Sequence, residues 1–325
     1  MKKNNYFVTG GTGSFSKKFI ESLIKNKLAK KIVIFSRDEY KQSLLKETDF
    51  IKKNISIFRF FIGDVRDKDR LEWALQDDID IVVHSAALKQ VPTTEYNPFE
   101  TVKTNIIGSQ NLIEVSLKKN IKKVVLISTD KAVSPINLYG STKLTAEKLF
   151  ISANIFKGAK KSNFSVVRYG NVMGSRGSVI PIFLKQKKDK FFTITNKDMT
   201  RFNISLDYAV KFVTKCISSM KGGEIFVPKL PSYRILDLAK AIDSSKKIKI
   251  IGIRTGEKIH EELVSSNEFQ ISVQKKDSFT IYPLRNNQKD NHRSYSYNSF
   301  NNPNYLNISQ IKKLISINIK DFDSI

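Results

Sequence analysis

The sequence contains a single cysteine, Cys216, and only three histidines among its 325 residues. One cysteine excludes an internal disulfide and is typical of a reducing compartment, so we expect a cytoplasmic protein. No cysteines and histidines have the spacing of a zinc site, and we expect no metal. Cys216 lies in the apolar-periodic stretch from Tyr208 to Met220, which predicts core packing rather than chemistry.

Long apolar runs are also missing, since none approaches the ~20 residues that a bilayer-spanning helix needs. The N-terminus, MKKNNYFVTGG, enters a predicted strand at once, and we therefore expect no signal peptide. The composition, with 40% hydrophobic and 27% charged residues, is typical of a globular protein that is large enough for an ample core. Together these features predict no membrane association.

Acidic residues are scarce, because 31 Asp and Glu face 56 Lys and Arg and leave a formal net charge of +25. Such a charge is typical of proteins that bind nucleic acid or another polyanion. However, the lysines are spread along the whole chain among Asn, Ile and Phe instead of forming one basic arm. This pattern indicates compositional drift at exposed positions, and we expect no nucleic-acid partner.

A glycine-rich turn follows the first predicted strand, Asn5 to Thr9, and precedes a helix that runs to about Asn26. Gly10, Gly13 and Ser16 have the spacing of a dinucleotide-binding turn in which serine replaces the third glycine. The glycines let the backbone approach a pyrophosphate, and the start of the helix favours its negative charge. We expect the cofactor to contact Gly10, Thr12, Gly13, Ser14 and Phe15.

The second predicted strand, Lys31 to Phe35, ends in Ser36, Arg37 and Asp38. An enzyme that selects NAD would place an acidic residue at this strand tip for the ribose 2′-hydroxyl. A guanidinium instead matches a 2′-phosphate in charge and geometry. Ser36 and Arg37 therefore favour NADP, with an ordinary surface arginine as the alternative interpretation.

Two further strands, Ser56 to Phe61 and Ile79 to Val83, lead into turns that suit the same cofactor. The first turn offers an acidic group near the adenine, and the second has small residues that leave space for a cofactor against the backbone. We expect cofactor contacts from Asp64, Val65, Ala86 and Ala87. The intervening His84 fits a structural histidine better than a catalytic base.

The stretch from Lys122 to Phe150 joins a strand to a helix that carries reactive side chains. Its apolar strand, Lys123 to Ser128, ends near Asp130 and Lys131, which form an acid-and-base pair of candidates. Tyr139 and Lys143 are four residues apart and so share one helical face. A fixed ammonium favours a neighbouring phenolate, so we expect Lys143 to lower the pKa of Tyr139. Tyr-x-x-x-Lys alone is common by chance. The prediction of a catalytic site therefore depends on its position just after the strand that ends near Asp130 and Lys131.

The alternation of strands and helices up to residue 168 predicts the α/β class, with a doubly wound, mostly parallel Rossmann sheet. We expect residues 1–168 to form an NADP-binding domain, to which residues 205–228 return as a helix and a strand. Residues 169–325 are expected to form mainly a smaller, C-terminal substrate-binding lobe. Within it, residues 286–304 predict a polar loop and Ile308 to Ile315 a closing helix.

Several motifs in order carry a resemblance to a known family. They are Thr9–Phe15, Ser36–Glu39, Ala86–Pro92, Ser128–Val133, Leu138–Lys143, Arg168–Gly174 and Gly252–Glu261. Over residues 6 to about 263, the chain resembles the extended short-chain dehydrogenase/reductases, and within them the inverting UDP-N-acetylglucosamine 4,6-dehydratases of the pseudaminic acid pathway. Capsule-type and membrane-anchored relatives generally carry Met where this chain has Tyr139. This chain departs from the family pattern at Ser16, where glycine is expected, and in an Asn-rich tail after about residue 265.

This resemblance implies a lyase that acts on UDP-N-acetylglucosamine with bound NADP, in the first step of pseudaminic acid synthesis for surface glycans or flagellin. It implies catalytic roles for Thr129, Asp130, Lys131, Tyr139 and Lys143. It also implies substrate contacts from Lys89, Thr129, Asn171, Arg201, Arg254 and Glu257, with Lys89 near the cofactor as well. A homo-oligomer, a hexamer in the family, is expected.

The implied chemistry needs a base at C4, a base at C5 and an acid at C6 of the sugar. Tyr139 would take the C4-hydroxyl proton, Lys131 the C5 proton once its pKa is lowered, and Asp130 would protonate the leaving C6 hydroxyl once burial has raised its pKa. A nucleotide-sugar epimerase of the same superfamily, which needs only the Tyr–Lys pair, remains an alternative. A non-catalytic nucleotide-binding regulator is another, although such a protein would be expected to lose these side chains.

Overall fold

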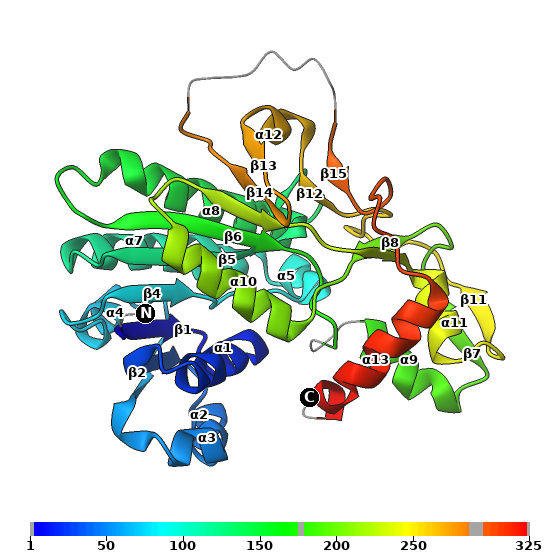
Figure 1. Ribbon diagram of the computed structural model, residues 1–325, viewed down its shortest axis with the longest axis horizontal. Coiled ribbons are helices and arrows are strands. Elements are labelled where there is room, and N and C mark those ends of the chain that lie inside the picture. The colour runs from blue at the N-terminus through cyan, green and yellow to red at the C-terminus, as the bar shows by residue number, and fades with distance from the viewer. Residues whose placement is uncertain (1–2, 175–178, 286–294, 324–325) are drawn as a thin grey trace.

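The computed structural model describes residues 3–174, 179–285 and 295–323, and the following statements concern these residues. Nine of their strands form one twisted sheet in the order β13-β14-β9-β6-β5-β4-β1-β2-β3 (Figure 1). These strands are β1 (Asn4–Thr9), β2 (Ala29–Ser36), β3 (Phe58–Ile62), β4 (Ile81–His84), β5 (Lys123–Thr129), β6 (Asn163–Tyr169), β9 (Ile225–Pro228), β13 (Ser272–Gln274) and β14 (Ser278–Ile281). From β3 to β9 all neighbours are parallel, whereas β14 and β13 are antiparallel.

The predicted strands of the first half are confirmed, with ends that differ by at most two residues. The centres of β1, β2, β4, β5 and β6 are apolar and buried, as expected of parallel strands that are covered on both faces. The observed order, 3-2-1-4-5-6 followed by β9, is that of a Rossmann sheet. The predicted fold class is therefore confirmed.

Helices cover both faces of this sheet, with α1 against α10 on one side and α4, α7 and α8 packed together on the other (Figure 1). The helices are α1 (Ser14–Lys25), α2 (Glu39–Lys46), α3 (Asp49–Lys52), α4 (Lys68–Ala74), α5 (Val91–Tyr96), α6 (Pro98–Val102), α7 (Gly108–Lys118), α8 (Leu138–Phe156), α9 (Val179–Lys185), α10 (Leu206–Ser219), α11 (Ile235–Ile242), α12 (Ser266–Gln270) and α13 (Ile308–Asp323). Short helical turns are η1 (Ile55–Ile57), η2 (Lys103–Ile107, a π-helical turn), η3 (Asp130–Ala132) and η4 (Gln186–Lys188). Cys216 is buried on α10, which confirms its expected place in the core.

Local capping determines where several helices begin. The side chains of Asp38, Asp67 and Ser205 accept hydrogen bonds from backbone N–H groups in the first turns of α2, α4 and α10, respectively. Ser265 and Glu268 form a reciprocal capping box at the start of α12.

A smaller lobe lies beside the sheet, at the right of Figure 1, and has its own apolar core. Phe183 of α9, Phe192 of β7, Leu238 of α11 and Ile311 of α13 meet there. Its short strands and those that bridge to it are β7 (Phe191–Ile194), β8 (Thr200–Phe202), β10 (Ser232–Arg234), β11 (Lys247–Ile250), β12 (Glu262–Val264) and β15 (Tyr297–Asn298). The predicted closing helix is confirmed as the longer α13.

The chain enters the large sheet again twice after residue 169. The first return places α10 against α1 and β9 beside β6. The second return, β13 and β14, was not anticipated, because the sequence analysis assigned its residues to the substrate lobe. Of the expected polar loop 286–304, residues 286–294 lie outside the described residues, while Tyr297–Asn298 form β15.

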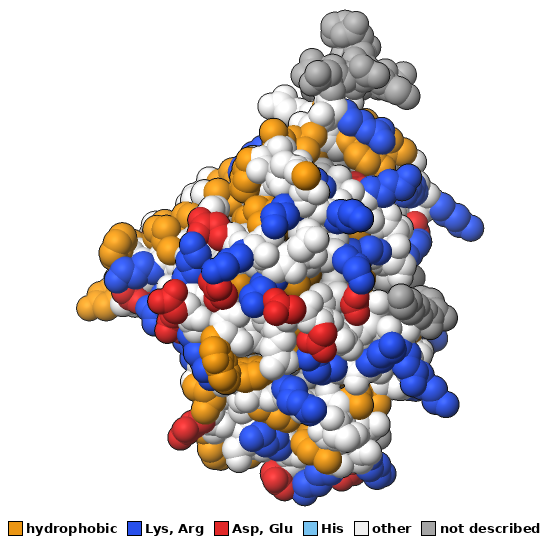
Figure 2. Space-filling model, turned by 90° about the vertical axis from the view of Figure 1, so that its left-hand side faces the viewer, with side chains coloured by type: hydrophobic (Ala, Val, Ile, Leu, Met, Phe, Trp, Pro, Cys, Tyr) orange, Lys and Arg blue, Asp and Glu red, His pale blue; other side chains and the backbone are white. Residues whose placement is uncertain are grey.

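The surface that Figure 2 shows has Lys and Arg side chains interspersed with carboxylates rather than gathered into one continuous basic face. Ion pairs such as Lys68–Glu114 and Lys118–Glu72 join neighbouring helices at the surface. Over the described part of the chain, no helix combines the length and the apolar character that a membrane span requires.

Candidate active site

A cleft of about 1180 Å³ lies at the carboxyl edge of the large sheet and is lined by residues of both lobes. Most residues that the sequence analysis placed in the site line this cleft: Gly10, Thr12, Gly13, Ser14, Phe15, Ser36, Arg37, Asp64, Val65, Ala86, Ala87, Lys89, Thr129, Lys131, Tyr139, Lys143, Asn171, Arg201, Arg254 and Glu257. The exception is Asp130, whose fully buried side chain lies directly behind the cleft wall and contacts Lys131.

The turn between β1 and α1 has the backbone geometry of an anion site. Gly10 has a φ of 62°, and a Cβ atom there would lie 2.9 Å from the backbone of Ala86, so this position requires glycine. The N–H of Gly13 donates to the carbonyl of Gly10 (2.9 Å), and Gly13, the N-cap of α1, has no side chain to occupy the N–H groups of the first turn. Those groups and the helix dipole suit a pyrophosphate, so the residues present fit a dinucleotide.

Ser16 stands at the third position of the glycine pattern and is fully buried beneath the turn. Its hydroxyl lies 2.7 Å from that of Ser85, which donates to the carbonyl of Thr9 (2.7 Å). The departure from glycine is therefore accommodated by a hydrogen-bond partner in the loop after β4.

The end of β2 holds the side chains expected to select the cofactor. The Ser36 hydroxyl accepts from Nε2 of Gln42 (3.0 Å), and the half-exposed Arg37 lies 3.4 Å from Oδ2 of Asp64. Burial would raise the pKa of Asp64, but hydrogen bonds from Arg66 and the charge of Arg37 lower it overall. Arg37 is thus held at the cleft beside an ionised carboxylate, with its guanidinium still half open to solvent.

His84 is a buried structural residue, as expected. Its Nδ1 lies 2.7 Å from the Thr9 hydroxyl, its Nε2 lies 3.1 Å from the Ser109 hydroxyl, and its ring stacks on Phe150. Burial, and to a smaller extent the charge of Lys143, lower the pKa of His84 to about 3. The ring is therefore neutral at neutral pH, and His84 is not among the described residues that line the cleft.

Helix α8 places the two predicted catalytic side chains in the cleft. Asn137 begins the helix by accepting from the N–H of Gly140 (2.8 Å), and Tyr139 lies in the first turn. Lys143 is almost fully buried one turn later, and its Nζ donates to the carbonyl of Ile127 on β5 (2.8 Å). This hydrogen bond ties the helix to the strand that ends in the acid-and-base pair.

The protonation of this helical pair differs from the sequence-based prediction. Burial raises the pKa of Tyr139 to about 12, and the opposing effects come from the charge of Lys131 and a hydrogen bond with Thr129. Burial lowers the pKa of Lys143 to about 8, against the charge of Glu147. The prediction that Lys143 lowers the pKa of Tyr139 is therefore wrong for the protein alone, because Lys131 supplies the stabilising charge.

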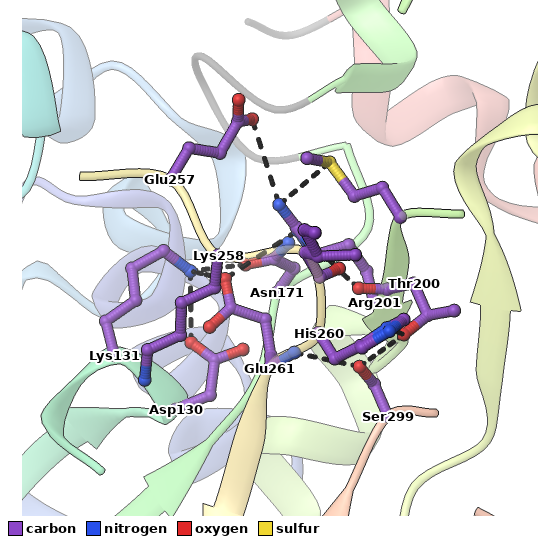
Figure 3. A network of polar contacts seen from close by, with 12 residues as sticks. Asp130, Lys131, Asn171, Thr200, Arg201, Glu257, Lys258, His260, Glu261 and Ser299 are labelled. Carbon is purple, nitrogen blue, oxygen red and sulfur yellow. Dashed lines mark hydrogen bonds and ion pairs between the residues drawn. The ribbon is translucent and has the colours of Figure 1, made fainter. Parts of the chain in front are cut away.

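Lys131 lies between two buried carboxylates (Figure 3). Its Nζ is 3.1 Å from Oδ1 of Asp130 and 3.0 Å from Oε1 of Glu261, and it also donates to Oδ1 of Asn171 (3.3 Å). The Thr129 hydroxyl donates to the same Asp130 oxygen (3.0 Å). The acid-and-base pair is therefore extended by a third ionisable group, Glu261, from the other lobe.

The pKa of Lys131 is another correction. Burial alone would lower it, but Asp130 and Glu261 raise it above its usual range, whereas the sequence analysis expected a lowered value. Burial raises the pKa of Asp130, Lys131 opposes part of this rise and Glu261 adds to it. Asp130 is therefore suited to act as an acid, as expected, but Lys131 is held as an ammonium.

The expected diphosphate-binding residues lie at different depths. Arg201 is largely buried, and its Nη1 donates to the carbonyls of Thr200 (2.7 Å) and Ile259 (3.0 Å). Its Nη2 is 3.8 Å from Oε1 of Glu257. Arg254 is exposed at the rim of the cleft. The exposed Arg254 is therefore better placed for a diphosphate than Arg201, whose donors have protein partners.

Two buried charged groups, Arg168 and Glu261, have no role that the sequence alone predicts. Arg168 is fully buried and donates to Glu147 of α8, to Glu268 of α12 and to the carbonyl of Leu263. Glu261 is the last residue of the Gly252–Glu261 motif, which singles it out in the sequence. The spacing within the motif does not show which side chain Glu261 contacts. Both groups connect segments that are about 100 or more residues apart, and only the fold shows these contacts.

Residues 6–283 match the model of the polysaccharide biosynthesis protein family. The chain belongs to this family. Its predicted resemblance to the extended short-chain dehydrogenase/reductases, and to the inverting dehydratases among them, is confirmed by the relatives below.

Two relatives and one solved structure are similar over most of the chain. The UDP-N-acetylglucosamine 4,6-dehydratase (inverting) of Campylobacter jejuni is 45% identical over 331 residues. The aligned region covers 97% of the present chain and 98% of the relative. A UDP-glucose 4-epimerase of Rickettsia bellii is 45% identical over 269 residues, which are 80% of the present chain and 77% of that relative. The structure of Pen from Bacillus thuringiensis has a TM-score of 0.88 and 38% identity, covering 97% and 99%.

Proposed function

We propose that the protein is a UDP-N-acetylglucosamine 4,6-dehydratase that inverts C5 and uses bound NADP. The observation that carries this proposal is that the acid-and-base pair, Asp130 and Lys131, lies with Tyr139 and Lys143 at a cleft that the dinucleotide turn also lines. The 45% identity to a relative named as this dehydratase supports the same substrate and reaction.

The chain's own residues would divide the proton transfers among them. Tyr139, which lines the cleft and contacts Thr129, takes the proton of the C4 hydroxyl. Once Lys131 has given up its own proton, its amine removes the C5 proton, which the C4 ketone has made acidic, and Asp130 protonates the C6 hydroxyl as it leaves. A dinucleotide held by the turn after β1 would supply a hydride acceptor and donor, so the reaction would be redox-neutral overall.

We propose that the cofactor is NADP because Ser36 and Arg37 occupy the end of β2, where an acidic residue would favour NAD. In this proposal, residues 1–168 with 205–228 bind the cofactor, and residues 169–325 mainly bind the sugar nucleotide through Asn171, Arg254 and Glu257. A cytoplasmic homo-oligomer in pseudaminic acid synthesis is the proposed setting, by similarity to the family.

The deciding experiment compares the wild type with Lys131→Ala in deuterated water. The wild type should convert UDP-N-acetylglucosamine to a 4-keto-6-deoxy sugar with the L configuration and deuterium at C5. Lys131→Ala should still remove hydride from C4 but neither exchange C5 nor eliminate water. Comparable exchange and elimination by the variant would show that another group is the base.

A second candidate function is epimerisation at C4, which the similarity to a relative named UDP-glucose 4-epimerase favours. An epimerase needs Tyr139 and Lys143 but no acid and base at C5 and C6. The product distinguishes the two functions, because an epimerase keeps the C6 hydroxyl and incorporates no deuterium at C5. The buried position of Asp130 against Lys131 favours the dehydratase.

A further inference from the structure

Asn137 stands directly before α8 and uses both ends of its side-chain amide. Its Oδ1 accepts a hydrogen bond from the N–H of Gly140 (2.8 Å) and so caps the helix, and its Nδ2 donates to the carbonyl of Gly256 (2.7 Å). Only 9% of Asn137 is exposed. Because the amide has one carbonyl and one NH₂ group, these two contacts fix its orientation. One buried side chain therefore joins the start of α8 to a residue that is 119 positions later in the chain.

Gly256 lies in a turn after β11 that faces the cleft. The N–H of Glu257 donates to the carbonyl of Arg254 (3.1 Å), and Gly256 has a φ of 75°, which favours glycine. A Cβ atom at Gly256 would lie 2.9 Å from Cβ of Asn137, so the turn packs directly against Asn137. All four residues of the turn, 254–257, line the cleft. The turn that carries the proposed diphosphate-binding residue Arg254 therefore rests on the residue that begins α8.

Two other hydrogen bonds join the same two segments without involving α8. Nζ of Lys258 donates to the carbonyl of Val133 (2.5 Å), and the Ser134 hydroxyl donates to Oε2 of Glu262 (2.9 Å). Both Val133 and Ser134 lie in the loop between η3 and α8. The two segments should therefore stay together when the hydrogen bond between Asn137 and the turn is removed.

Tyr139 follows Asn137 by two residues and lies in the first turn of α8, where its side chain lines the cleft. The N–H of Leu138 donates to Oε1 of Glu95 on α5 (2.6 Å), so the start of the helix has a second partner. Helix ends fray, and the position of the Tyr139 hydroxyl therefore depends on how firmly this first turn is held.

We propose that Asn137 is a positioning residue through which binding of the substrate's diphosphate at the turn holds Tyr139 in place for proton removal. The inference rests on the proposed dehydratase function, in which Arg254 binds the diphosphate and Tyr139 is the base at C4. A diphosphate that holds the turn also fixes the Gly256 carbonyl and, through Asn137, the first turn of α8. Binding energy from a part of the substrate that does not react is thereby used at the reacting atom.

The test compares Asn137→Ser with Asn137→Ala in the whole protein. Serine caps a helix as well as asparagine does but has no amide N–H for the Gly256 carbonyl, whereas alanine loses both contacts. Gly256→Ala disturbs the same contact from the other side, because its Cβ atom would meet Asn137. Glu262→Ala is the matched control, since it removes the contact with Ser134 between the same two segments.

The first measurement is amide hydrogen exchange with and without UDP, which carries the diphosphate but no sugar that could react. In the wild type, UDP should slow exchange about fivefold or more both in the turn 254–257 and at the start of α8, residues 138–142. In Asn137→Ser, UDP should still slow exchange in the turn but should change exchange at the start of α8 by less than about twofold. Glu262→Ala should respond as the wild type does.

The second measurement is single-turnover removal of hydride from C4 of UDP-N-acetylglucosamine. For Asn137→Ser we expect the rate at saturating substrate to fall about tenfold, as for one lost hydrogen bond, while KM stays within about threefold because Arg254 still binds the diphosphate. Gly256→Ala should slow the step to a similar extent. The double variant should lose no more than the slower single variant, because both changes break one contact. Asn137→Ala should be at least as slow as Asn137→Ser.

Wild-type rates in Asn137→Ser, with a loss confined to Asn137→Ala, would show that Asn137 only caps the helix and would overturn the inference. UDP protection of α8 that persists in Asn137→Ser, or that is missing in the wild type, would overturn it as well. If Asn137→Ser does not fold, the same two measurements on Gly256→Ala decide the matter. These outcomes are separate from the dehydratase function, which fails only if the wild type does not eliminate water from UDP-N-acetylglucosamine.

Discussion

The hydroxyl oxygens of Ser16 and Ser85 lie 2.7 Å apart beneath the glycine turn. Ser85 donates its own proton to the carbonyl of Thr9, so Ser16 is the donor between the two. The third position of the dinucleotide-binding turn is usually glycine. Here it is Ser16, whose hydroxyl has a hydrogen-bond partner, Ser85, in the loop after β4. This hydrogen bond connects α1 to the loop that follows β4.

The first prediction follows from this pair. Ser16→Ala should lower the free energy of unfolding by about 1 kcal/mol, because one buried hydrogen bond is lost. In a double-mutant cycle with Ser85→Ala, the coupling energy measured by urea unfolding should be about 0.5–1.5 kcal/mol. Ser22→Ala, a change farther along the same helix, should cost less than about 0.5 kcal/mol. Additive effects of the two mutations would contradict the pairing.

Arg37→Ala tests cofactor selection. Because a guanidinium–phosphate contact contributes about 1.5–3 kcal/mol, the affinity for NADP measured by calorimetry on stripped protein should fall about tenfold or more. The affinity for NAD should change by less than about threefold, since NAD has no 2′-phosphate. Arg59→Ala, an exposed arginine that bonds to backbone carbonyls, is the control. Equal losses for both cofactors, or equal affinities in the wild type, would argue against NADP selection.

Tyr139→Phe tests the base at C4. The variant keeps the buried ring but loses the phenolic oxygen, so single-turnover hydride removal should slow by about 10²–10⁴-fold. The free energy of unfolding should change by about 1 kcal/mol or less, because the packing is kept. Near-normal hydride removal by a folded variant would exclude Tyr139 from this role.

Arg168→Met should be the most destabilising of these changes. Its removal leaves the buried Glu147 and the partly buried Glu268 without their cation, and such a loss costs about 3–5 kcal/mol. Denaturant unfolding gives the measurement, with Arg59→Met as the exposed control. A cost below about 1 kcal/mol would mean that the two carboxylates find other partners.

His84 predicts a pH dependence of stability. Its pKa is about 3 in the folded protein against 6.5 ordinarily, so the unfolded chain binds a proton first as the pH falls. Stability is therefore lost below about pH 6.5, by at most about 1.4 kcal/mol per pH unit from this group. Urea unfolding at pH 7, 6 and 5 should show a shallower decline for His84→Gln than for the wild type. Parallel declines would mean that His84 is protonated in the folded state.

The first half of the fold could be predicted because its signals are local. The glycine turn, the apolar β-branched strands and the Tyr139–Lys143 spacing each lie within a few residues, and each occurs as expected. The gathering of most predicted site residues at one cleft follows from parallel strands, whose carboxyl ends share an edge of the sheet.

What could not be predicted depends on contacts between distant segments. The ammonium of Lys131 is stabilised by Glu261, 130 residues later, so its pKa moves in the direction opposite to the one that burial predicts. Likewise, Ser272–Gln274 and Ser278–Ile281 are too short to indicate strands of the large sheet by themselves. Their place is determined by the open edge of β9, which the sequence does not show.

The order in which β6, β9 and β14 lie side by side affects how the protein is made. On a ribosome, strands β1 to β6 emerge long before β9, which flanks β6, and β14 emerges later still. Until residue 281 has left the exit tunnel, the nascent sheet presents an unpaired apolar edge of the kind that joins chains together. A stop codon anywhere between β6 and β14 should therefore give aggregates rather than a smaller folded protein, and the full chain should depend on chaperones during synthesis.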